Sequence, residues 1–440
     1  MREPDTLQRD LVLVGGGHSH ALALRLLAMR PLGGLRTTLV SPASHTPYSG
    51  MLPGLVAGHY RFEETHIDLA RLCQWAGVRF VASEVTALDP VARTLSIPGR
   101  PPIGYDVVSI DIGSQPELDS VPGAREYATP VKPVADFWQR WRRLLAELET
   151  DSGGRPGIAV VGGGAGGIEL AMAFAHALGG RVRVELYWAG PELLPEYHPR
   201  TRRAVTAALA RLDVGMNPDS RVARVEAGQL LLESGACAGY DHLFWCTGAS
   251  AAPWVAASGL QIDERGFLAV RDTLQSLGDE RVFAAGDIAT QVNHPRPKAG
   301  VYAVRQAPVL AANLRSVLLG EPLREHRPQR RFLSLVSLGG QRAAADRGVL
   351  SFDGAWVWRW KDRIDREFME RFDDMPALMG REPDRLPADT DAPVQPHCGG
   401  CGAKVAADTL GRVLHRLSRR FPEHCRPEDL GDDVSAIPGS

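Results

Sequence analysis

The chain has 440 residues, enough for about three domains of ordinary size, so a single small binding module is excluded. Its 50 lysines and arginines nearly balance its 52 aspartates and glutamates. A chain without a strong net charge has no general attraction for phosphate backbones, and we expect no nucleic-acid partner. Apolar residues make up 44% and charged residues 23% of the sequence, as in ordinary globular proteins rather than disordered or fibrous ones.

Cysteine usage and the N-terminal sequence indicate a cytoplasmic protein. The six cysteines are too few for a disulfide scaffold in so long a chain. The charged first ten residues do not read as a signal peptide, and no stretch reaches the roughly 18 apolar residues that a spanning helix needs. We therefore expect a cytoplasmic location and no transmembrane segment. The oligomeric state stays open, a homodimer included.

One sequence pattern occurs twice along the chain. Residues 11–24 read LVLVGGGHSHALAL, and residues 158–171 read IAVVGGGAGGIELA. Each is an apolar run, a glycine cluster and an Ala/Leu-rich segment, which predicts a buried strand, a tight turn and a helix. Other apolar runs predict further strands, at residues 37–40, 107–112, 182–187, 243–246 and 282–285. We predict an α/β fold with two Rossmann-like dinucleotide-binding domains, the second inserted in the first, and a small α+β segment after them.

These patterns also predict where the parts of the chain begin and end. A proline-rich stretch without periodicity follows the α+β segment and is typical of a linker. The predicted parts are the first dinucleotide-binding domain (residues 1–115 and 265–328), the second (116–264), the α+β segment (329–379), the linker (380–396) and a further unit (397–440).

Each glycine cluster has the form of a dinucleotide-binding turn. In a Gly-x-Gly-x-x-Gly turn, backbone N–H groups approach a pyrophosphate, and the N-terminus of the following helix stabilises its negative charge. Gly162, Gly164 and Gly167 match this pattern fully. In the first cluster Gly15 and Gly17 match, but a histidine stands at the third glycine position. Two clusters in matching contexts favour dinucleotide binding over ordinary turns.

Two details of these turns need separate interpretation. His18 and His20 form a His-x-His pair, but no cysteine or carboxylate cluster nearby completes a metal site, so a metal is not favoured. An acidic residue usually binds the ribose at the end of the second strand, yet Ser41 and Trp188 occupy these two positions. The choice between NADH and NADPH therefore stays open.

The motifs of residues 11–372 resemble those of the pyridine nucleotide-disulfide oxidoreductase superfamily. The resemblance rests on the two glycine clusters, on Thr247-Gly248 and on Ala285-Gly286-Asp287. The stretches PKAGVYAVRQAPVLAANL and FLSLVSLGG are similar to those of type II NADH dehydrogenases. The resemblance implies that the first cluster binds FAD and the second NAD(P)H, with Asp287 on the ribityl–phosphate region of the flavin.

The same resemblance assigns roles to individual residues. Lys298 would stand before a helix that begins near the isoalloxazine, and Gln306 would lie near the nicotinamide or the electron acceptor. The implied FAD contacts are Gly15, Gly16, Gly17, His18, Ser41, Gly286, Asp287 and Lys298. The implied NAD(P)H contacts are Gly162, Gly164, Gly167 and Glu169.

The cysteine pair that disulfide-reducing members hold beside the flavin is not present in the sequence pattern. Cys73, Cys237 and Cys246 have no close partner in sequence, and we expect each to be buried and inert. The electron acceptor is then a small molecule, a quinone or a selenium species rather than a protein dithiol.

The loop HCGGCGAKV at residues 397–405 has three interpretations. A structural zinc site needs four ligands, and no second paired motif accompanies Cys398 and Cys401. A thioredoxin-like dithiol lacks the preceding βαβ pattern. The loop and GDDVSAIP at residues 431–438 together resemble the beginning of selenide, water dikinase, also called selenophosphate synthetase.

This second resemblance implies a kinase site. Cys401 and Lys404 would be its catalytic residues, and Asp433 would bind Mg²⁺, with ATP as the other cofactor of a completed kinase. The resemblance covers only the beginning of such a kinase. We therefore expect the chain as given not to make selenophosphate.

The sequence as a whole predicts an FAD-dependent NAD(P)H oxidoreductase that passes hydride to flavin and electrons on to an unidentified small-molecule acceptor. The C-terminal extension links it to selenium metabolism. Two alternatives remain. One is a peripheral membrane NADH:quinone oxidoreductase anchored by Trp356, Trp358 and Trp360. The other is a non-catalytic flavin sensor or docking module for the kinase.

Overall fold

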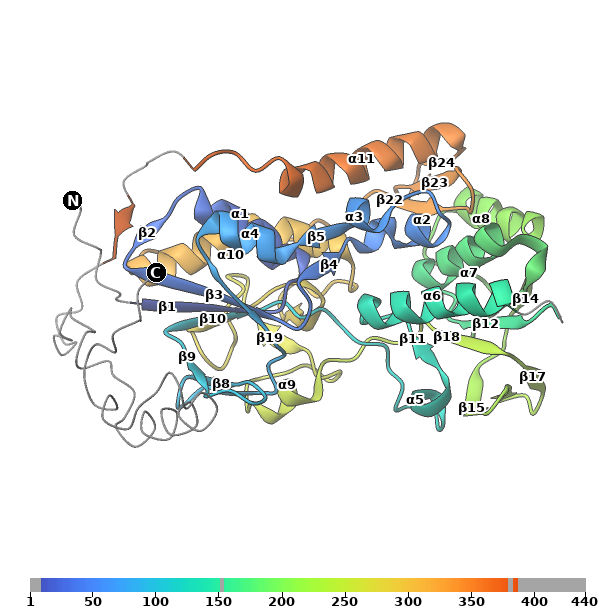
Figure 1. The fold of residues 1–440 in the computed structure, drawn as a ribbon, viewed down its shortest axis with the longest axis horizontal. Coiled ribbons are helices and arrows are strands. Elements are labelled where there is room, and N and C mark those ends of the chain that lie inside the picture. The colour runs from blue at the N-terminus through green and yellow to red at the C-terminus, as the bar shows by residue number, and fades with distance from the viewer. Residues whose placement is uncertain (1–8, 151–153, 379–382, 387–440) are drawn as a thin grey trace, which may run out of the picture. The chain divides into compact units, whose positions relative to one another are not determined.

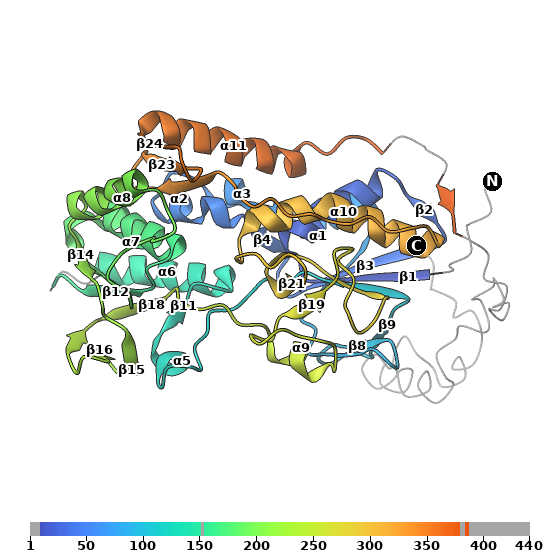
Figure 2. The ribbon, with the colours of Figure 1, turned by 180° about the vertical axis from the view of Figure 1, so that it is seen from behind.

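The computed structural model describes residues 9–150, 154–378 and 383–386, all within one compact unit, Leu7–Pro387. Figures 1 and 2 show it from opposite sides. The predicted kinase residues Cys401, Lys404 and Asp433 lie outside the described residues.

The first sheet has five parallel strands in the order β20-β10-β1-β3-β6. Its strands are β1 (Arg9–Val14), β3 (Leu35–Ser41), β6 (Arg79–Ala82), β10 (Val107–Ile110) and β20 (Val282–Ala284). Leu11 and Leu13 of β1 join one apolar cluster, and Val12 and Val14 join another. A strand buried on both faces needs apolar side chains at successive positions, which explains the continuous apolar run.

Helices and a small sheet cover the two faces of this first sheet. The first cluster includes residues of α1 (His18–Ala28), α4 (Leu69–Ala76) and α10 (Gly300–Leu319). Figure 1 shows these helices on one side of β1 and β3, and Figure 2 shows the same for α1 and α10. The opposite cluster includes residues of β7 (Ala87–Asp89), β8 (Thr94–Ser96) and α9 (Pro253–Ala257).

The second sheet repeats the plan of the first. Its parallel order is β11-β18-β12-β13-β14. The strands are β11 (Thr129–Pro130), β12 (Gly157–Val161), β13 (Arg183–Tyr187), β14 (Val214–Asn217) and β18 (His242–Trp245). One face packs on α6 (Val134–Thr150), α7 (Ala165–Leu178) and α8 (Pro199–Arg211), and the other on α5 (Ala124–Tyr127) and strands β15 (Val222–Glu226) and β16 (Gln229–Leu232).

Strand β20 joins the first sheet only after the chain has completed the second sheet. The second Rossmann-like unit is therefore inserted in the first, and the predicted α/β fold class is confirmed. The residue limits predicted for the separate domains stay predictions.

A small antiparallel sheet and a long helix follow the two parallel sheets. The sheet comprises β22 (Ser334–Ser337), β23 (Ala343–Asp346) and β24 (Ser351–Gly354), and the helix is α11 (Ala355–Asp373). Helix α11 contacts this sheet and also α3 (Phe62–Thr65) and β5 (His66–Asp68) of the first unit. In Figure 1, α11 accordingly runs above both α2 (Leu52–Val56) and α3.

Short elements complete the described part of the chain. They are β2 (Leu32–Gly33) paired with β25 (Asp384–Arg385), β4 (His45–Pro47) paired with β5, β9 (Ile103–Gly104) on β8, β17 (Cys237–Gly239) on β16, β19 (Leu268–Val270) paired with β21 (Ala289–Gln291), and the 3₁₀ turns η1 (Ser49–Met51), η2 (Gly179–Arg181) and η3 (Gly286–Ile288).

The cysteine prediction is wrong for one residue. Cys73 is buried and Cys246 is half-buried, and burial raises the pKa of each thiol to about 12. Cys237 is exposed, because β17 is the outer strand of a small sheet. All three are free, so they form no disulfide in the described part of the chain.

We expect Gly167→Ala to destabilise the protein because α7 packs closely on β12. A Cβ added at Gly167 would overlap the carbonyl oxygen of Gly162, a backbone atom with little freedom to move, whereas one added at Gly166 meets nothing within 4 Å. Overpacking of this kind lowers the free energy of unfolding by about 1–3 kcal/mol. Urea denaturation of Gly167→Ala and of its control, Gly166→Ala, measures the difference. Equal stabilities would contradict the close approach.

Candidate functional site

The first glycine cluster forms the turn between β1 and α1. Gly15 has φ +90°, a conformation that favours glycine. A Cβ added at Gly17 or at Gly286 would overlap the Asp111 carboxyl group. The β1–α1 turn, the end of β10 and η3 therefore meet at one place, at the carboxyl ends of three neighbouring strands.

The N-terminus of α1 is suited to an anion. Its N-cap is Gly17, which offers no side-chain cap, and its first turn holds no acidic residue. The unpaired N–H groups and the helix dipole at such an end favour negative charge. Ser41 ends β3 beside this turn, buried, with its hydroxyl donating to the Ala43 carbonyl at 3.0 Å. The cradle fits the pyrophosphate of a dinucleotide.

His18 and His20 do not form a metal site. The His20 ring nitrogens lie 2.7 Å from the Gly15 carbonyl oxygen and 2.8 Å from the Ser109 hydroxyl, so both already have partners. Burial lowers the pKa of each imidazole to about 4, which keeps both neutral. No cluster of metal ligands occurs among the described residues. His20 replaces the third glycine of the motif with a side chain that ties the turn to β10.

Asp287 lies in η3, directly after β20, and has a cationic partner. Its Oδ2 accepts hydrogen bonds from Lys132 Nζ at 3.0 Å and from Ser114 Oγ at 3.1 Å. Sequence reasoning missed Lys132, Ser114 and Asp111. Each follows a strand closely, and the rule that ligands bind at the carboxyl ends of parallel strands was the signal that could have found them.

Lys298 and Gln306 line a pocket with Asp287. Lys298 Nζ donates to the Ala289 carbonyl and to Thr290 Oγ1, both at 2.8 Å, and burial lowers its pKa to about 8. Gln306 Oε1 accepts from the Gly286 N–H at 2.8 Å. The pocket thus holds a cation beside a carboxylate, close to the beginning of α10.

The second glycine cluster forms the equivalent turn between β12 and α7. Gly164 is the N-cap of α7, and an added Cβ there meets nothing within 4 Å, so the space in front of the helix is open. Gly167 permits the close packing described above. Trp188 follows β13 and is buried, and its indole Nε1 has no hydrogen-bond partner among the described residues. A Cβ added at Gly163 would lie 2.6 Å from Trp188 Cβ, which places the indole directly against this turn.

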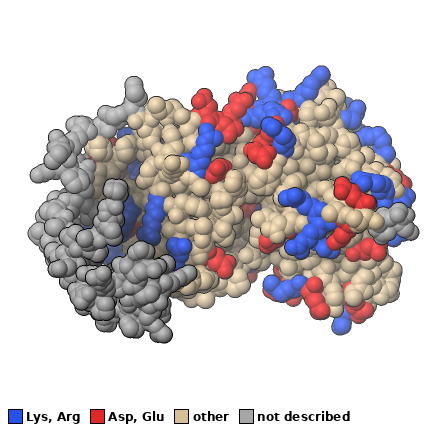
Figure 3. Space-filling view, viewed as in Figure 1, with Lys and Arg blue, Asp and Glu red and all other residues tan. Residues whose placement is uncertain are grey.

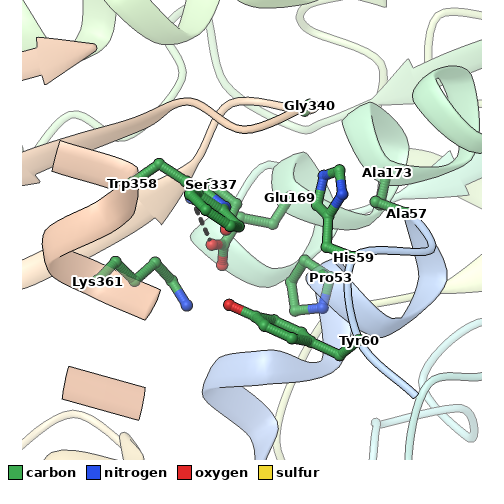
Figure 4. Close-up of a pocket in the computed structure, with 12 residues that line it drawn as sticks. Pro53, Ala57, His59, Tyr60, Glu169, Ala173, Ser337, Gly340, Trp358 and Lys361 are labelled. Carbon is green, nitrogen blue, oxygen red and sulfur yellow. Dashed lines mark hydrogen bonds between the residues drawn. The ribbon is translucent and has the colours of Figure 1, made fainter. Parts of the chain in front are cut away.

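A pocket lies where the two parallel-sheet units and α11 meet (Figure 4). Tyr60 and His59 come from the segment after α2, Glu169 from α7, and Trp358 and Lys361 from α11. Figure 4 shows Glu169, Tyr60 and Lys361 pointing into the same space. Residues more than 300 positions apart in the sequence therefore share one polar pocket.

The charges in this pocket are buried and coupled. Lys361 Nζ donates to Asp365 Oδ2 and to the Gly50 carbonyl, both at 2.6 Å. Glu169 accepts from the Ser337 N–H at 2.7 Å, and burial raises its pKa to about 6, against the opposing effect of Lys361. A carboxyl group with this pKa can exchange a proton near neutral pH.

The three tryptophans of α11 do not act together. Residues two positions apart lie about 200° apart around a helix, so they cannot all face one way. Trp358 lines the pocket, whereas Trp356 and Trp360 are 49% and 40% exposed. No helix in the described part is long and apolar enough to cross a membrane. Acidic and basic side chains intermingle on the face drawn in Figure 3.

The predicted site residues thus fall into two groups. The first surrounds the β1–α1 turn and η3, and the second surrounds the β12–α7 turn. The first group is Gly15, Gly16, Gly17, His18, Ser41, Gly286, Asp287 and Lys298, and the second is Gly162, Gly164, Gly167 and Glu169.

Comparisons with known proteins find a family and several relatives. The family model described as pyridine nucleotide-disulphide oxidoreductase matches residues 9–307. Demethylphylloquinone reductase NdbB of Synechocystis is 26% identical over 331 residues, covering 72% of this chain and 82% of the relative. NADH dehydrogenase-like protein YutJ of Bacillus subtilis is 23% identical over 351 residues, covering 78% and 94%.

Solved structures show the same fold. The sulfide:quinone oxidoreductase from Aquifex aeolicus superposes with a TM-score of 0.68 at 19% identity, over 83% of this chain and 91% of its own. NDH2 from Plasmodium falciparum in complex with NADH gives a TM-score of 0.69 at 15% identity, over 83% and 98%. The comparisons give no support to the beginning of a selenide, water dikinase.

We expect Lys361→Met to destabilise the protein because it leaves the buried Asp365 carboxylate without its cation. Breaking a buried pair from one side costs about 3–5 kcal/mol of unfolding free energy, whereas replacing both partners by apolar residues is often neutral. The double variant Lys361→Met/Asp365→Leu is therefore expected to regain most of the loss.

Thermal and urea denaturation at pH 7 measure both variants. The control is Arg363→Met, which breaks the exposed pair with Glu367 on the same helix and is expected to change stability far less. A double variant as unstable as the single one would show that the pair does not account for the loss.

Proposed function

Because the chain belongs to the pyridine nucleotide-disulphide oxidoreductase family, we propose that it is an FAD-dependent NAD(P)H oxidoreductase that reduces a small-molecule acceptor. The observation that carries the proposal is the pair of glycine turns, each at the carboxyl end of a parallel sheet and each followed by a helix whose N-cap is a glycine. FAD, when bound, supplies the chemistry of accepting a hydride and delivering electrons to an acceptor.

The first turn and its neighbours would hold FAD. The α1 N-terminus would receive the pyrophosphate, and Ser41 lies where the adenosine ribose of a dinucleotide is bound in such folds. Asp287 accepts hydrogen bonds, so it suits hydroxyl groups of the ribityl chain. Lys298 provides a positive charge near the start of α10, where negative charge on a reduced flavin ring is stabilised.

The second turn would hold NAD(P)H in front of α7. The open space at Gly164 leaves room for a pyrophosphate, and Glu169 lies one helical turn further along α7, in the pocket of Figure 4. Residues from both units line this pocket, so the protein would orient donor and flavin towards one another there, and Trp358 and Tyr60 would limit access of water.

A quinone is the acceptor class that we favour. Relatives of this chain carry names such as demethylphylloquinone reductase and type II NADH:quinone oxidoreductase. Reducing a quinone to a quinol consumes two protons, and Glu169 with its pKa of about 6 can hold and release one near neutral pH. The free cysteines of the described chain form no dithiol beside the flavin motifs, which argues against a thiol acceptor relay.

Peripheral membrane attachment is a second candidate property. Exposed apolar side chains gather at the β23–β24 turn and the beginning of α11, where Val349 is 75% and Leu350 56% exposed. Phe352, Trp356 and Trp360 continue this surface, and Trp358 is no part of it. A quinone dissolved in a membrane would be reached most directly from such a surface.

The selenium link stays a separate prediction. It depends on Cys401, Lys404 and Asp433, which would act in a completed kinase with Mg²⁺ and ATP. Selenide-dependent ATP consumption by a chain extended beyond residue 440 tests it independently of the flavin chemistry.

We expect purified protein to carry FAD and its visible absorption to bleach on anaerobic addition of NADH or NADPH. Gly164→Val should keep the flavin but raise the KM for the nicotinamide cofactor at least about tenfold, because the new side chain enters the pyrophosphate space, and tenfold corresponds to about 1.4 kcal/mol of binding. Stopped-flow bleaching measures this, with Gly166→Val as the control on the same helix.

Protein that takes up no FAD would refute the proposal. Flavin that stays oxidised with both nicotinamide cofactors would instead favour the sensor alternative. Loss of flavin from Gly164→Val would mean that the two cofactor sites are assigned the wrong way round.

We expect the protein to discriminate only weakly between NADH and NADPH, because Trp188 stands at the position that usually holds an acidic residue. A carboxylate at this position would accept from the ribose hydroxyls of NADH and repel a 2′-phosphate, whereas the unpaired Trp188 N–H is a neutral donor. Trp188→Glu should shift the ratio of kcat/KM towards NADH by at least about tenfold. Steady-state kinetics with both cofactors measure the ratio, and an unchanged ratio would place the ribose elsewhere.

A further inference from the structure

Asp111 places a carboxyl group at the helix N-terminus that is assigned above to the FAD pyrophosphate. It follows β10 and is 2% exposed. Its Oδ2 accepts a hydrogen bond from the backbone N–H of His20 at 3.1 Å, and Ser19 also hydrogen-bonds to the carboxyl group. Asp111 therefore caps α1 from a different element, in place of the side chain that Gly17 lacks.

The carboxyl group is enclosed on the sides where the glycines lie. A Cβ at Gly17 would overlap both of its oxygens, and a Cβ at Gly286 would overlap Oδ1. The two glycines thus make room for the Asp111 carboxyl group. A buried anion here lies within the same small region of low dielectric as the proposed pyrophosphate.

The charged groups around Asp111 determine how strongly this region repels a further anion, such as the FAD pyrophosphate. Asp287 of η3 contributes a second negative charge, and Lys132 pairs with it at 3.0 Å. His18 and His20 of α1 are neutral, each with its pKa lowered to about 4 by burial. When Asp111 is protonated, Lys132 balances Asp287. When Asp111 is ionised, it adds a second negative charge at the helix N-terminus, and the nearest cations, Lys132 and Lys298, interact with Asp287.

We propose that Asp111 must be protonated for tight FAD binding, because its ionised carboxylate competes with the FAD pyrophosphate for the N-terminus of α1. This inference rests on the proposed FAD site. Binding of FAD to protein with ionised Asp111 then takes up one proton from solvent, which neutralises the carboxylate. The neutral carboxyl group keeps an oxygen to accept from His20 and gains an O–H that can donate.

The direction of the pH effect follows from this linkage. Burial raises the pKa of the Asp111 carboxyl to about 7, and Asp287 raises it further against the hydrogen bonds from His20 and Ser19. Bound FAD adds negative charge and raises the pKa again. FAD affinity is therefore greatest below about pH 7 and falls as pH rises. The total fall is about tenfold for each unit by which bound FAD raises the pKa of Asp111.

Release of FAD from the loaded protein tests the proposal. The protein is equilibrated between pH 6 and pH 9 at constant ionic strength, and the free flavin is separated by ultrafiltration and measured by fluorescence. The dissociation constant of the wild-type protein is expected to rise across this range. Asp111→Asn, which keeps an acceptor for His20 but cannot ionise, is expected to remove the rise.

Two variants separate Asp111 from other titrating groups. Lys298 has its pKa lowered to about 8 and would also lose charge in this range, but Lys298→Arg keeps its charge and is expected to retain the rise. Asp346 is a buried carboxylate of β23 that accepts from Thr201 Oγ1 at 2.7 Å, far from this turn in the chain. Asp346→Asn is the matched control, and its FAD dissociation constant is also expected to rise with pH.

A measurement on the wild-type protein alone covers the case in which Asp111→Asn does not fold. In weakly buffered solution at pH 8, rebinding of FAD should take up close to one proton per flavin, read with a pH indicator dye. Binding that is independent of pH, or a rise that persists in Asp111→Asn, would overturn the inference and leave the proposed function intact. Protein that binds no FAD at any pH would overturn both.

Discussion

The carboxyl ends of parallel strands and the N-termini of the helices that follow them meet at one edge of a sheet, and the proposed cofactor sites depend on this geometry. In this protein the arrangement occurs twice, at the β1–α1 and β12–α7 turns. Because each strand is buried on both faces, its register is fixed by apolar packing, so the turn at its end is held rigidly. A dinucleotide then meets backbone N–H groups that are already oriented.

Buried charge is concentrated around these turns and in the pocket between the units. Asp111, Glu169 and Asp365 are carboxyl groups whose pKa values burial raises, and Lys298 is an amine whose pKa burial lowers. Burying a charge is unfavourable unless it is paired, so groups of this kind are expected where binding or proton transfer needs them. Lys361 has both roles, since its positive charge pairs with the Asp365 carboxylate and also lowers the pKa of Glu169 in the pocket.

Helix α11 contributes both to the pocket proposed for cofactor and acceptor chemistry and to the exposed apolar surface proposed for membrane attachment. Its buried side carries Lys361 and Trp358 into the pocket, and its exposed side carries Trp356 and Trp360. The helix period puts these roles on opposite faces of one element. An acceptor that reached the pocket from the exposed tryptophans would therefore approach along a single helix.

The sequence alone determined the two turns, because glycine spacing and apolar runs encode local backbone geometry and burial. It placed Gly162, Gly164 and Gly167 at a strand–helix turn, which is the β12–α7 turn of the structure. It also predicted the α/β fold class and the insertion of one unit in the other. Their positions after strands mark Asp111 and Lys132 only as candidates, because a carboxylate or an amine becomes informative only when its partner from another element is known. The Lys361–Gly50 contact spans 311 positions of the chain. Only the tertiary structure could bring such groups together, since no local pattern records which distant segments will pack against each other.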